Sequence, residues 1–139
     1  MPDPIAPRNN AMAVAASALK AQQSRMRIIA ENIANAESTA QTPGGTPYRR
    51  QVAVFEARTV DGVTGVALAE VRADQRDFRM AYDPSHPAAN AEGYVARPNV
   101  DTLIEAMDMR EAQRAYEANL NVIETARSME SRTLDLLKR

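Results

Sequence analysis

Apolar side chains recur every seven residues near both ends of this 139-residue chain. In the stretch 101–137, one row is Ala115, Val122, Met129 and Leu136, and a neighbouring row is Met109, Tyr116, Ile123 and, beyond Glu130, Leu137. The stretch has no Gly or Pro and is rich in good helix formers. We therefore predict one helix, roughly 55 Å long at about 1.5 Å per residue, that packs lengthwise on other helices.

The segment 11–36 repeats this pattern at the other end of the chain. Its first row is Met12, Leu19, Met26 and Ile33, and its second is Ala15, Ile29 and Ala36, interrupted by Gln22. Asn9 or Asn10 is the expected helix cap. Three prolines among the first seven residues favour an extended, flexible tail over 1–10. The shared period predicts that the two terminal helices pack as a coiled-coil-like pair.

Between the helices, the segment 37–100 changes to loops and short alternating runs. Short strands are expected at residues 52–55, 66–72, 78–82 and 94–95. A turn is expected at Gly62–Gly65, and Asp101 or Asn99 is expected to cap the helix over 101–139. The predicted fold is therefore mainly α, with a loop and small β region inserted between two long terminal helices.

Asn119, Asn121 and Glu130 fall on or beside the apolar face of the C-terminal helix. One interpretation is a helix of an ordinary bundle with polar residues at its rim. The other is a subunit helix in an assembly, where polar residues at seam positions fix the register. The residues predicted to form an assembly interface are Met12, Leu19, Met26, Ile29, Ile33, Met109, Ala115, Tyr116, Asn119, Val122, Ile123, Met129, Leu136 and Leu137.

The composition argues against several classes of protein. Hydrophobic residues make up 45% of the chain but aromatic residues only 4%, which favours helices that gain burial from neighbours over one dense private core. The absence of Cys excludes disulfides and thiolate metal sites. A net charge of -1 argues against nucleic-acid binding, and no apolar run is long enough for membrane insertion.

Catalytic chemistry is not expected either. The only histidine, His86, lies near Asp83 in a turn bounded by prolines, and we interpret it as a turn residue. The helix carboxylates, Glu105 among them, are interpreted as a solvated face. Arg49 and Arg50 follow Tyr48, which suggests a local salt bridge or a subunit contact. The sequence shows no nucleophile–base pair, phosphate cradle or ligand cluster, so we predict no enzyme activity, metal or cofactor.

The run over residues 11–19 imitates a secretory signal, with Ala16-Ser17-Ala18 as its cleavage site. Two observations argue against this interpretation. The run is mostly Ala, so it is only marginally hydrophobic, and the seven-residue row continues straight through the supposed cleavage site. We therefore expect no cleaved signal peptide.

Four stretches of sequence resemble the axial proteins of the bacterial flagellum, and its basal-body rod proteins in particular. They are SALKAQQSRMRIIAENIANAEST (17–39), TPGGTPYRR (42–50), AYDPSHPAANAEGYVARPNV (81–100) and MDMREAQRAYEANLNVIETARSM (107–129). The NIANA segment is shared among axial proteins generally. The stretch DPSHPAANAEGYVARPNV, followed by an AYEANL-type helix, is more specific to a rod subunit, and the resemblance covers nearly the whole chain from about Ala15.

The resemblance implies a structural subunit that assembles helically in the proximal rod, the drive shaft that crosses the periplasm. Its terminal helices would form an inner tube around the export channel, and its middle segment an outer layer. The implied partners are further copies of itself, other rod subunits, the rod–export-gate junction protein and the flagellar type III export apparatus, which exports such subunits without a cleaved signal. The implied role is to transmit torque in flagellum-dependent motility.

The sequence leaves two alternative functions open. A soluble helical binding or adaptor module without catalytic activity predicts a stable monomer whose thermal transition does not depend on concentration. A small hydrolase using His86 and Asp83 predicts that His86→Ala abolishes an activity.

Overall fold

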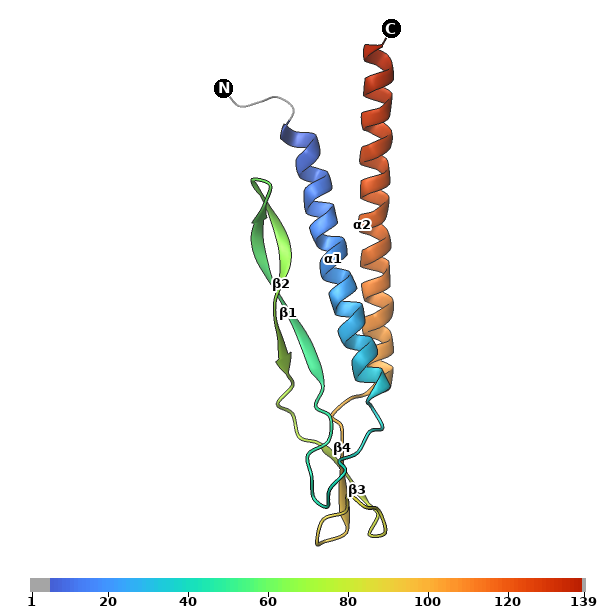
Figure 1. Cartoon of the computed structure of the whole chain (residues 1–139). Coiled ribbons are helices and arrows are strands. Elements are labelled where there is room, and N and C mark those ends of the chain that lie inside the picture. The colour runs from blue at the N-terminus through green and yellow to red at the C-terminus, as the bar shows by residue number, and fades with distance from the viewer. Residues whose placement is uncertain (1–5, 139) are drawn as a thin grey trace. The chain divides into compact units, whose positions relative to one another are not determined.

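The computed structural model describes residues 6–138, with side chains from residue 11 onward. The elements in chain order are α1 (Ala6–Ala34), β1 (Gln51–Val60), β2 (Val63–Ala73), β3 (Arg79–Tyr82), β4 (Tyr94–Arg97) and α2 (Thr102–Leu137) (Figure 1). β1 pairs with β2 and β3 with β4, in two separate two-stranded sheets. The predicted mainly α fold with a small β insert is confirmed, whereas coiled-coil packing of the helices stays a prediction.

The chain divides into two compact units, each of which takes part of both helices and of the β1–β2 hairpin. The helix–hairpin unit comprises Met1–Arg25, Val54–Glu70 and Glu111–Arg139, and the polar unit comprises Met26–Ala53 and Val71–Arg110. Each unit therefore combines segments from both halves of the chain.

α1 begins at Ala6 rather than at residue 11, so the predicted tail over 1–10 is helical from residue 6; residues 1–5 of that tail lie outside the described residues. Pro7 is tolerated because the first turn of a helix has backbone N–H groups without intrahelical partners, and proline lacks only such a group. Asn9 and Asn10 lie inside the helix, so neither is its cap. The proline-based prediction failed because it treated proline as a breaker at every helical position.

α2 begins where the sequence places a cap. The Asp101 carboxylate oxygen Oδ1 accepts hydrogen bonds from the backbone N–H of Leu103 at 3.0 Å and of Ile104 at 3.4 Å. These bonds satisfy two of the four N–H groups that a helix start leaves unpaired. Asp101 is therefore the cap, and Asn99 has a different role, described below.

The β1–β2 hairpin is longer than predicted, with strands of 10 and 11 residues. Its turn is Asp61-Gly62, where φ is 49° and 83°. Two successive positive φ angles are typical of the type I′ turn, which matches the twist of the flanking strands. The turn is therefore not at Gly62–Gly65, because Gly65 lies within β2.

Gly65 marks the place where the hairpin comes closest to α1 within the helix–hairpin unit. A Cβ atom at Gly65 would lie 2.6 Å from the Ser17 hydroxyl oxygen. That hydroxyl accepts a hydrogen bond from the N–H of Val66 at 3.2 Å and donates one to the Val14 carbonyl at 2.7 Å. A side chain here would push the strand away from the helix, which explains a glycine inside a strand.

β3 and β4 are antiparallel, with Arg79 opposite Arg97 and Tyr82 opposite Tyr94. The two tyrosine rings meet edge to face, with their centroids 5.2 Å apart. The loop between these strands contains His86, whose Nδ1 accepts a hydrogen bond from the N–H of Ala88 at 3.0 Å. His86 is thus the turn residue predicted from the sequence.

Candidate assembly interface

In the helix–hairpin unit, α1 and α2 lie side by side and antiparallel (Figure 1). Arg25 pairs with Glu111 at 3.7 Å, while Met12, nearer the start of α1, lines the same cavity as Ile123. The α2 face with reduced exposure contains the half-buried residues Met109, Ala115, Tyr116, Asn119, Ile123 and Ala126, together with the fully buried Ala112. Their spacing of three and four residues is that of one helix face.

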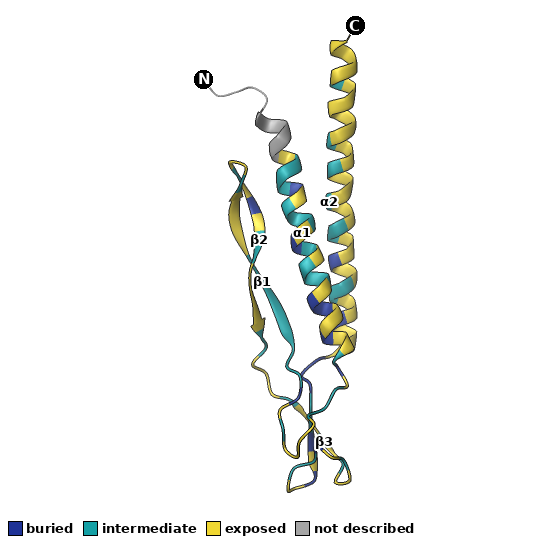
Figure 2. Ribbon diagram, in the orientation of Figure 1, coloured by how far each residue is buried: buried dark blue, intermediate teal, exposed yellow. Residues whose placement is uncertain are grey.

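The adjacent apolar row of α2 is exposed within this chain from Val122 onward, and Figure 2 shows that much of α2 is exposed. Val122 is 47% exposed, Met129 62% and Leu136 71%, and Leu137 is 77% exposed. Residues spaced by seven drift by only about 20° per step around a straight helix, so the first three share a face. The two predicted rows therefore differ in exposure, and each also changes along the helix. Met109, Tyr116 and Ile123 of one row are half-buried but Leu137 is exposed, whereas in the other row Ala115 is half-buried and Val122, Met129 and Leu136 are exposed.

On α1, the predicted residues also differ in burial. Ile29 is buried, Met12, Leu19 and Met26 are half-buried, and Ile33 is 38% exposed. Ile28, which was not predicted, is more deeply buried than any of them. Ala21 is also buried and precedes Ile28 by seven residues, so this third row was a signal that the sequence analysis did not use.

The polar unit contains a buried ion pair between Arg50 and Glu105. The Arg50 Nε donates to Glu105 Oε1, and the Glu105 side chain is fully buried. The same guanidinium reaches Asp74 Oδ2 at 3.3 Å and Asp108 Oδ2 at 3.6 Å. The interpretation of Glu105 as part of a solvated face is wrong, because a salt bridge and a hydrogen bond from Asn32 allow this carboxylate to be buried.

Asn32, the first residue of the NIANA segment, forms hydrogen bonds in the same cluster through both the oxygen and the nitrogen of its side-chain amide. Its oxygen accepts hydrogen bonds from the Tyr48 hydroxyl at 2.7 Å and the Gln51 N–H at 2.9 Å. Its nitrogen donates to the Gln51 carbonyl at 2.8 Å and to Glu105 Oε2 at 3.3 Å. All four hydrogen-bonding positions of the amide are therefore occupied, and α1, the start of β1 and α2 are joined through one side chain.

Asn99, the next-to-last residue of the stretch 81–100, has the corresponding role. Its oxygen accepts from the N–H of Arg50 at 2.8 Å, and its nitrogen donates to the carbonyls of Asp74 and Arg76, both at 3.0 Å. The two motif asparagines therefore satisfy backbone groups that have no strand partner. This explains why these residue types occur in the two segments that resemble rod proteins.

The surroundings of the buried Arg50–Glu105 pair shift the pKa values of Tyr48, Arg50, Asp74 and Arg76. Burial raises the pKa of Tyr48, with smaller contributions from the charges of Glu31 and Glu105, so its hydroxyl remains a donor. Burial acts to lower the pKa of Arg50, but the hydrogen bonds and charges of Glu105 and Asp74 outweigh it and raise that pKa. The hydrogen bond from Arg76 lowers the pKa of Asp74 from 3.8 to about 2, although burial opposes the shift.

The Asp74 shift predicts a loss of stability in acid. Because the folded-state pKa is depressed, this contribution is present above the unfolded value of 3.8 and is lost as the pH falls toward about 2. Since Arg76 is 65% exposed, solvent screening limits the contribution to about 1 kcal/mol. The free energies of unfolding of wild type and Asp74→Asn should therefore differ at about pH 5 and converge at about pH 2. An unchanged difference across this range would contradict the assignment.

Gln22, which interrupts the second row of α1, provides a stability prediction. In the part of the chain that the structure describes, its Oε1 is the one buried side-chain polar atom without a hydrogen-bond partner. A buried acceptor without a partner costs about 1–3 kcal/mol, so Gln22→Leu should raise the free energy of unfolding by about 1 kcal/mol in urea denaturation. The matched control is Gln23→Leu at the exposed neighbouring position, which should have almost no effect. Equal effects would contradict the prediction.

The described residues contain neither a candidate metal site nor a candidate membrane-spanning helix. No group of three or more His, Cys, Asp or Glu side chains within residues 6–138 is arranged to hold a metal ion. No helix in the same range has the length and apolar character needed to cross a membrane.

Comparison with known proteins identifies the family. Residues 12–40 match the family described as "Flagella basal body rod protein", and residues 91–136 match "Flagellar basal body rod FlgEFG protein C-terminal". The flagellar basal-body rod protein FlgC of Agrobacterium fabrum is 48% identical over 134 residues, which cover 95% of this chain and 96% of that protein. The chain belongs to the FlgC family of flagellar basal-body rod proteins.

More distant FlgC proteins cover nearly the same length. The protein of Escherichia coli O6:H1 is 40% identical over 129 residues, covering 91% of this chain and 96% of the relative. The FlgC protein of Bacillus subtilis is 35% identical over 142 residues, covering 90% of this chain and 95% of the relative. As a member of the FlgC family, the chain is a structural protein of the flagellar basal-body rod, and this assignment implies a role in motility.

The two matched segments of this FlgC-family chain carry the features described above. Residues 12–40 contain most of α1 and Asn32, and residues 91–136 contain β4, Asn99, Glu105 and nearly all of α2. The sequence analysis missed the function of Glu105, although Glu105 precedes Ala112 by seven residues, in step with Asn119 and Ala126. That spacing places Glu105 in the covered row and was the signal that could have found it.

Proposed function

We propose that this chain assembles helically in the proximal rod, with copies of itself and with other rod subunits, through the uncovered apolar row of α2. The observation that carries the proposal is the exposure of Val122, Met129 and Leu136 within the isolated chain. Burying such side chains contributes about 1.5–3 kcal/mol each. A regular apolar row on a long helix is suited to lengthwise packing against helices of neighbouring subunits.

The assembled helices would surround the export channel and transmit torque along the rod. The continuous hydrogen bonding of a helix of 36 residues supports a stiff element. We further propose that the chain contacts the rod–export-gate junction protein and reaches the rod through the type III apparatus without a cleaved signal. The supporting observation is that α1 runs without interruption through Ala16-Ser17-Ala18, the sequence that imitates a cleavage site.

We also propose that the chain is not an enzyme. The support is its membership of a family of structural rod proteins and the position of His86. The Nδ1 atom of His86 accepts a hydrogen bond from the N–H of Ala88 within the turn, an arrangement that serves the backbone. The alternative of a hydrolase would require His86→Ala to abolish an activity.

The test is complementation of cells that lack their own FlgC-family protein. We expect this chain to restore swimming and to be present in isolated basal bodies. A chain that is expressed but absent from basal bodies would contradict the proposed function. The soluble binding module makes the opposite prediction: absence from basal bodies and a sharp thermal transition that does not change with protein concentration.

A further inference from the structure

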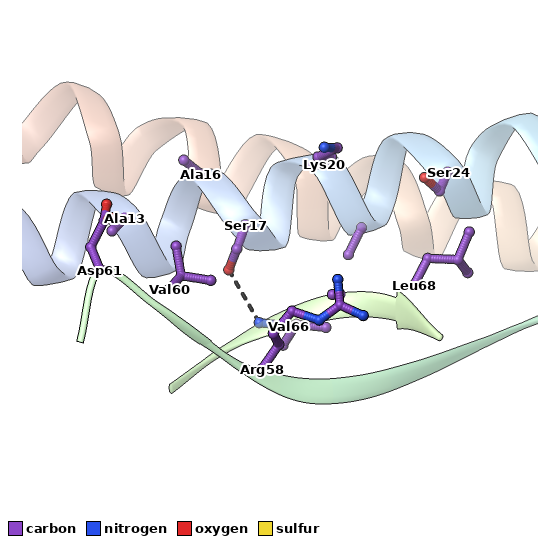
Figure 3. Close-up of a pocket in the computed structure, with 12 residues that line it drawn as sticks. Ala13, Ala16, Ser17, Lys20, Ser24, Arg58, Val60, Asp61, Val66 and Leu68 are labelled. Carbon is purple, nitrogen blue, oxygen red and sulfur yellow. Dashed lines mark hydrogen bonds between the residues drawn. The ribbon is translucent and has the colours of Figure 1, made fainter. Parts of the chain in front are cut away.

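The outer part of the β1–β2 hairpin, residues 54–70, packs loosely against α1. A groove of about 540 Å³ lies between the two elements, entirely within the helix–hairpin unit (Figure 3). Well-packed protein interiors leave few voids larger than a water molecule, and atoms that border a void lose the dispersion contacts of a closed interface. The helix wall has mainly small side chains and the hairpin adds larger apolar ones, which are Ala13, Ala16, Ala21 and Ser24 against Val60, Val66 and Leu68.

One hydrogen bond fastens this part of the hairpin to α1. The Ser17 hydroxyl accepts it from the backbone N–H of Val66 at 3.2 Å, beside the close approach at Gly65. Among the described side chains, no other hydrogen bond or ion pair joins residues 54–69 to α1. Arg58 pairs with Glu56 on its own strand instead. The polar part of the contact with α1 therefore depends on this single bond, which we call the latch.

The base of the same hairpin is held much more firmly, within the polar unit. The N–H and the carbonyl of Gln51 both bond to the Asn32 amide, at 2.9 and 2.8 Å. The N–H of Arg50 donates to Asn99 Oδ1 at 2.8 Å, and its carbonyl accepts from the N–H of Asp74, also at 2.8 Å. Both asparagines are buried. Backbone held by buried hydrogen bonds opens only at a high free energy, so the base is the fixed end of the hairpin.

The hairpin keeps its own structure when the latch opens. Its strands pair with each other and have 10 and 11 residues. The Asp61-Gly62 turn, with positive φ at both residues, joins such strands tightly. Because the N–H of Val66 donates to Ser17, opening the latch breaks none of the hydrogen bonds between β1 and β2.

We infer that residues 54–70 form a strap: an arm with a fixed base that swings away from α1 as one unit when the latch opens. The closed strap covers Ala21, which is buried and lines the groove, and the open strap uncovers that face of α1. An arm of this kind adapts to different neighbours, since its free end moves while its base keeps its place. The inference concerns the isolated chain, so it goes beyond the proposed function and does not depend on it.

The natural absence of Cys allows spin labels to be attached at two chosen positions. Labels at Gln23→Cys and Thr59→Cys join two exposed positions of the helix–hairpin unit, one on α1 and one on the strap. Labels at Ala30→Cys and Gln75→Cys, two exposed positions of the polar unit, provide the matched reference pair. Pulsed EPR on the purified full chain should show two distance populations for the first pair, closed and open, and one for the reference pair. A single population of equal width for both pairs would contradict the strap.

Two variants act on the latch from opposite sides. Ser17→Ala removes the acceptor, and Gly65→Ala places a Cβ atom 2.6 Å from the Ser17 hydroxyl oxygen. Each should raise the ratio of open to closed populations about two- to tenfold, the range that corresponds to the loss of one hydrogen bond. The matched control is Ser24→Ala, since Ser24 lines the same groove and its hydroxyl has no described bond to the hairpin. It should leave the ratio unchanged.

Amide hydrogen exchange then tests whether the strap moves as one unit. The amides that bond between β1 and β2 should be as well protected in Ser17→Ala as in wild type, because the pairing of the strands is not broken. Loss of that protection would mean that the hairpin unfolds rather than swings, and it would overturn the strap. A population ratio that neither latch variant changes would overturn it as well. An equal rise for Ser24→Ala would contradict the role of the bond between Ser17 and Val66 as the latch.

Discussion

Replacing Arg50 with Met should destabilise the polar unit by about 3–5 kcal/mol, because it leaves the fully buried Glu105 carboxylate without its cation. Asp74 and Asp108 lose the same partner. Urea denaturation of the full chain measures the change, and hydrogen exchange at the β4 amides localises it to the polar unit. The double variant Arg50→Met/Glu105→Leu should recover much of the loss, since it removes the uncompensated charge along with the pair.

The matched control is Arg49→Met, one residue away. Arg49 donates to the carbonyls of Asp74 and Arg76 at 2.8 and 2.9 Å and lies 4.2 Å from the centroid of the Phe78 ring. Both carbonyls keep hydrogen bonds from Asn99 when Arg49 is lost, and no buried charge is left behind. A loss of about 1 kcal/mol is expected. Equal losses for the two arginines would contradict the central role of the buried pair.

Replacing Val122 with Asp should abolish motility while leaving the isolated chain about as stable as wild type. Val122 is 47% exposed, so within one chain the new carboxylate keeps contact with water, and surface changes typically alter stability by about 0.5 kcal/mol or less. In an assembled rod the same charge would be buried in an apolar contact, which costs several kcal/mol. Motility in soft agar measures assembly, and thermal denaturation measures stability.

Two further variants complete this experiment. Ile123→Asp lies in the half-covered row, so it should reduce both stability and motility. Glu111→Gln should be mild, because its side chain is 73% exposed and its 3.7 Å contact with Arg25 is a surface ion pair worth less than about 1 kcal/mol. If Val122→Asp and Glu111→Gln behave alike in the motility assay, the assignment of the exposed row as an interface is wrong.

The sequence predicted the features that depend on local periodicity. Rows spaced by seven residues predicted both helices, and the sequence offered Asp101 or Asn99 as the cap of α2, of which Asp101 has that role. The alternation of Phe78, Met80 and Tyr82 predicted a strand where β3 lies. In each case a few neighbouring residues determine the outcome, because backbone hydrogen bonding and side-chain direction are local properties.

Features that depend on distant residues were not predictable in the same way. Neighbouring rows of one helix have similar composition, so the sequence alone does not tell that Ile123 is covered and Val122 is exposed. The pair of Arg50 and Glu105 joins residues far apart in sequence, and each appears by itself to be an ordinary surface charge. The seven-residue spacing places Glu105 in the covered row, but the groups that allow its burial come from distant parts of the chain: Arg50 bonds one carboxylate oxygen and Asn32 donates to the other.

The double hydrogen bond between the Asn32 amide and the backbone of Gln51 also has a consequence for unwanted association. Two-stranded sheets expose unpaired edges that can template the addition of a foreign strand. At Gln51 both the N–H and the carbonyl are already bonded to a side chain, so the beginning of β1 has no free backbone groups there. Where many copies crowd together, a side-chain amide in place of a third strand protects that point of the hairpin against strand exchange and aggregation.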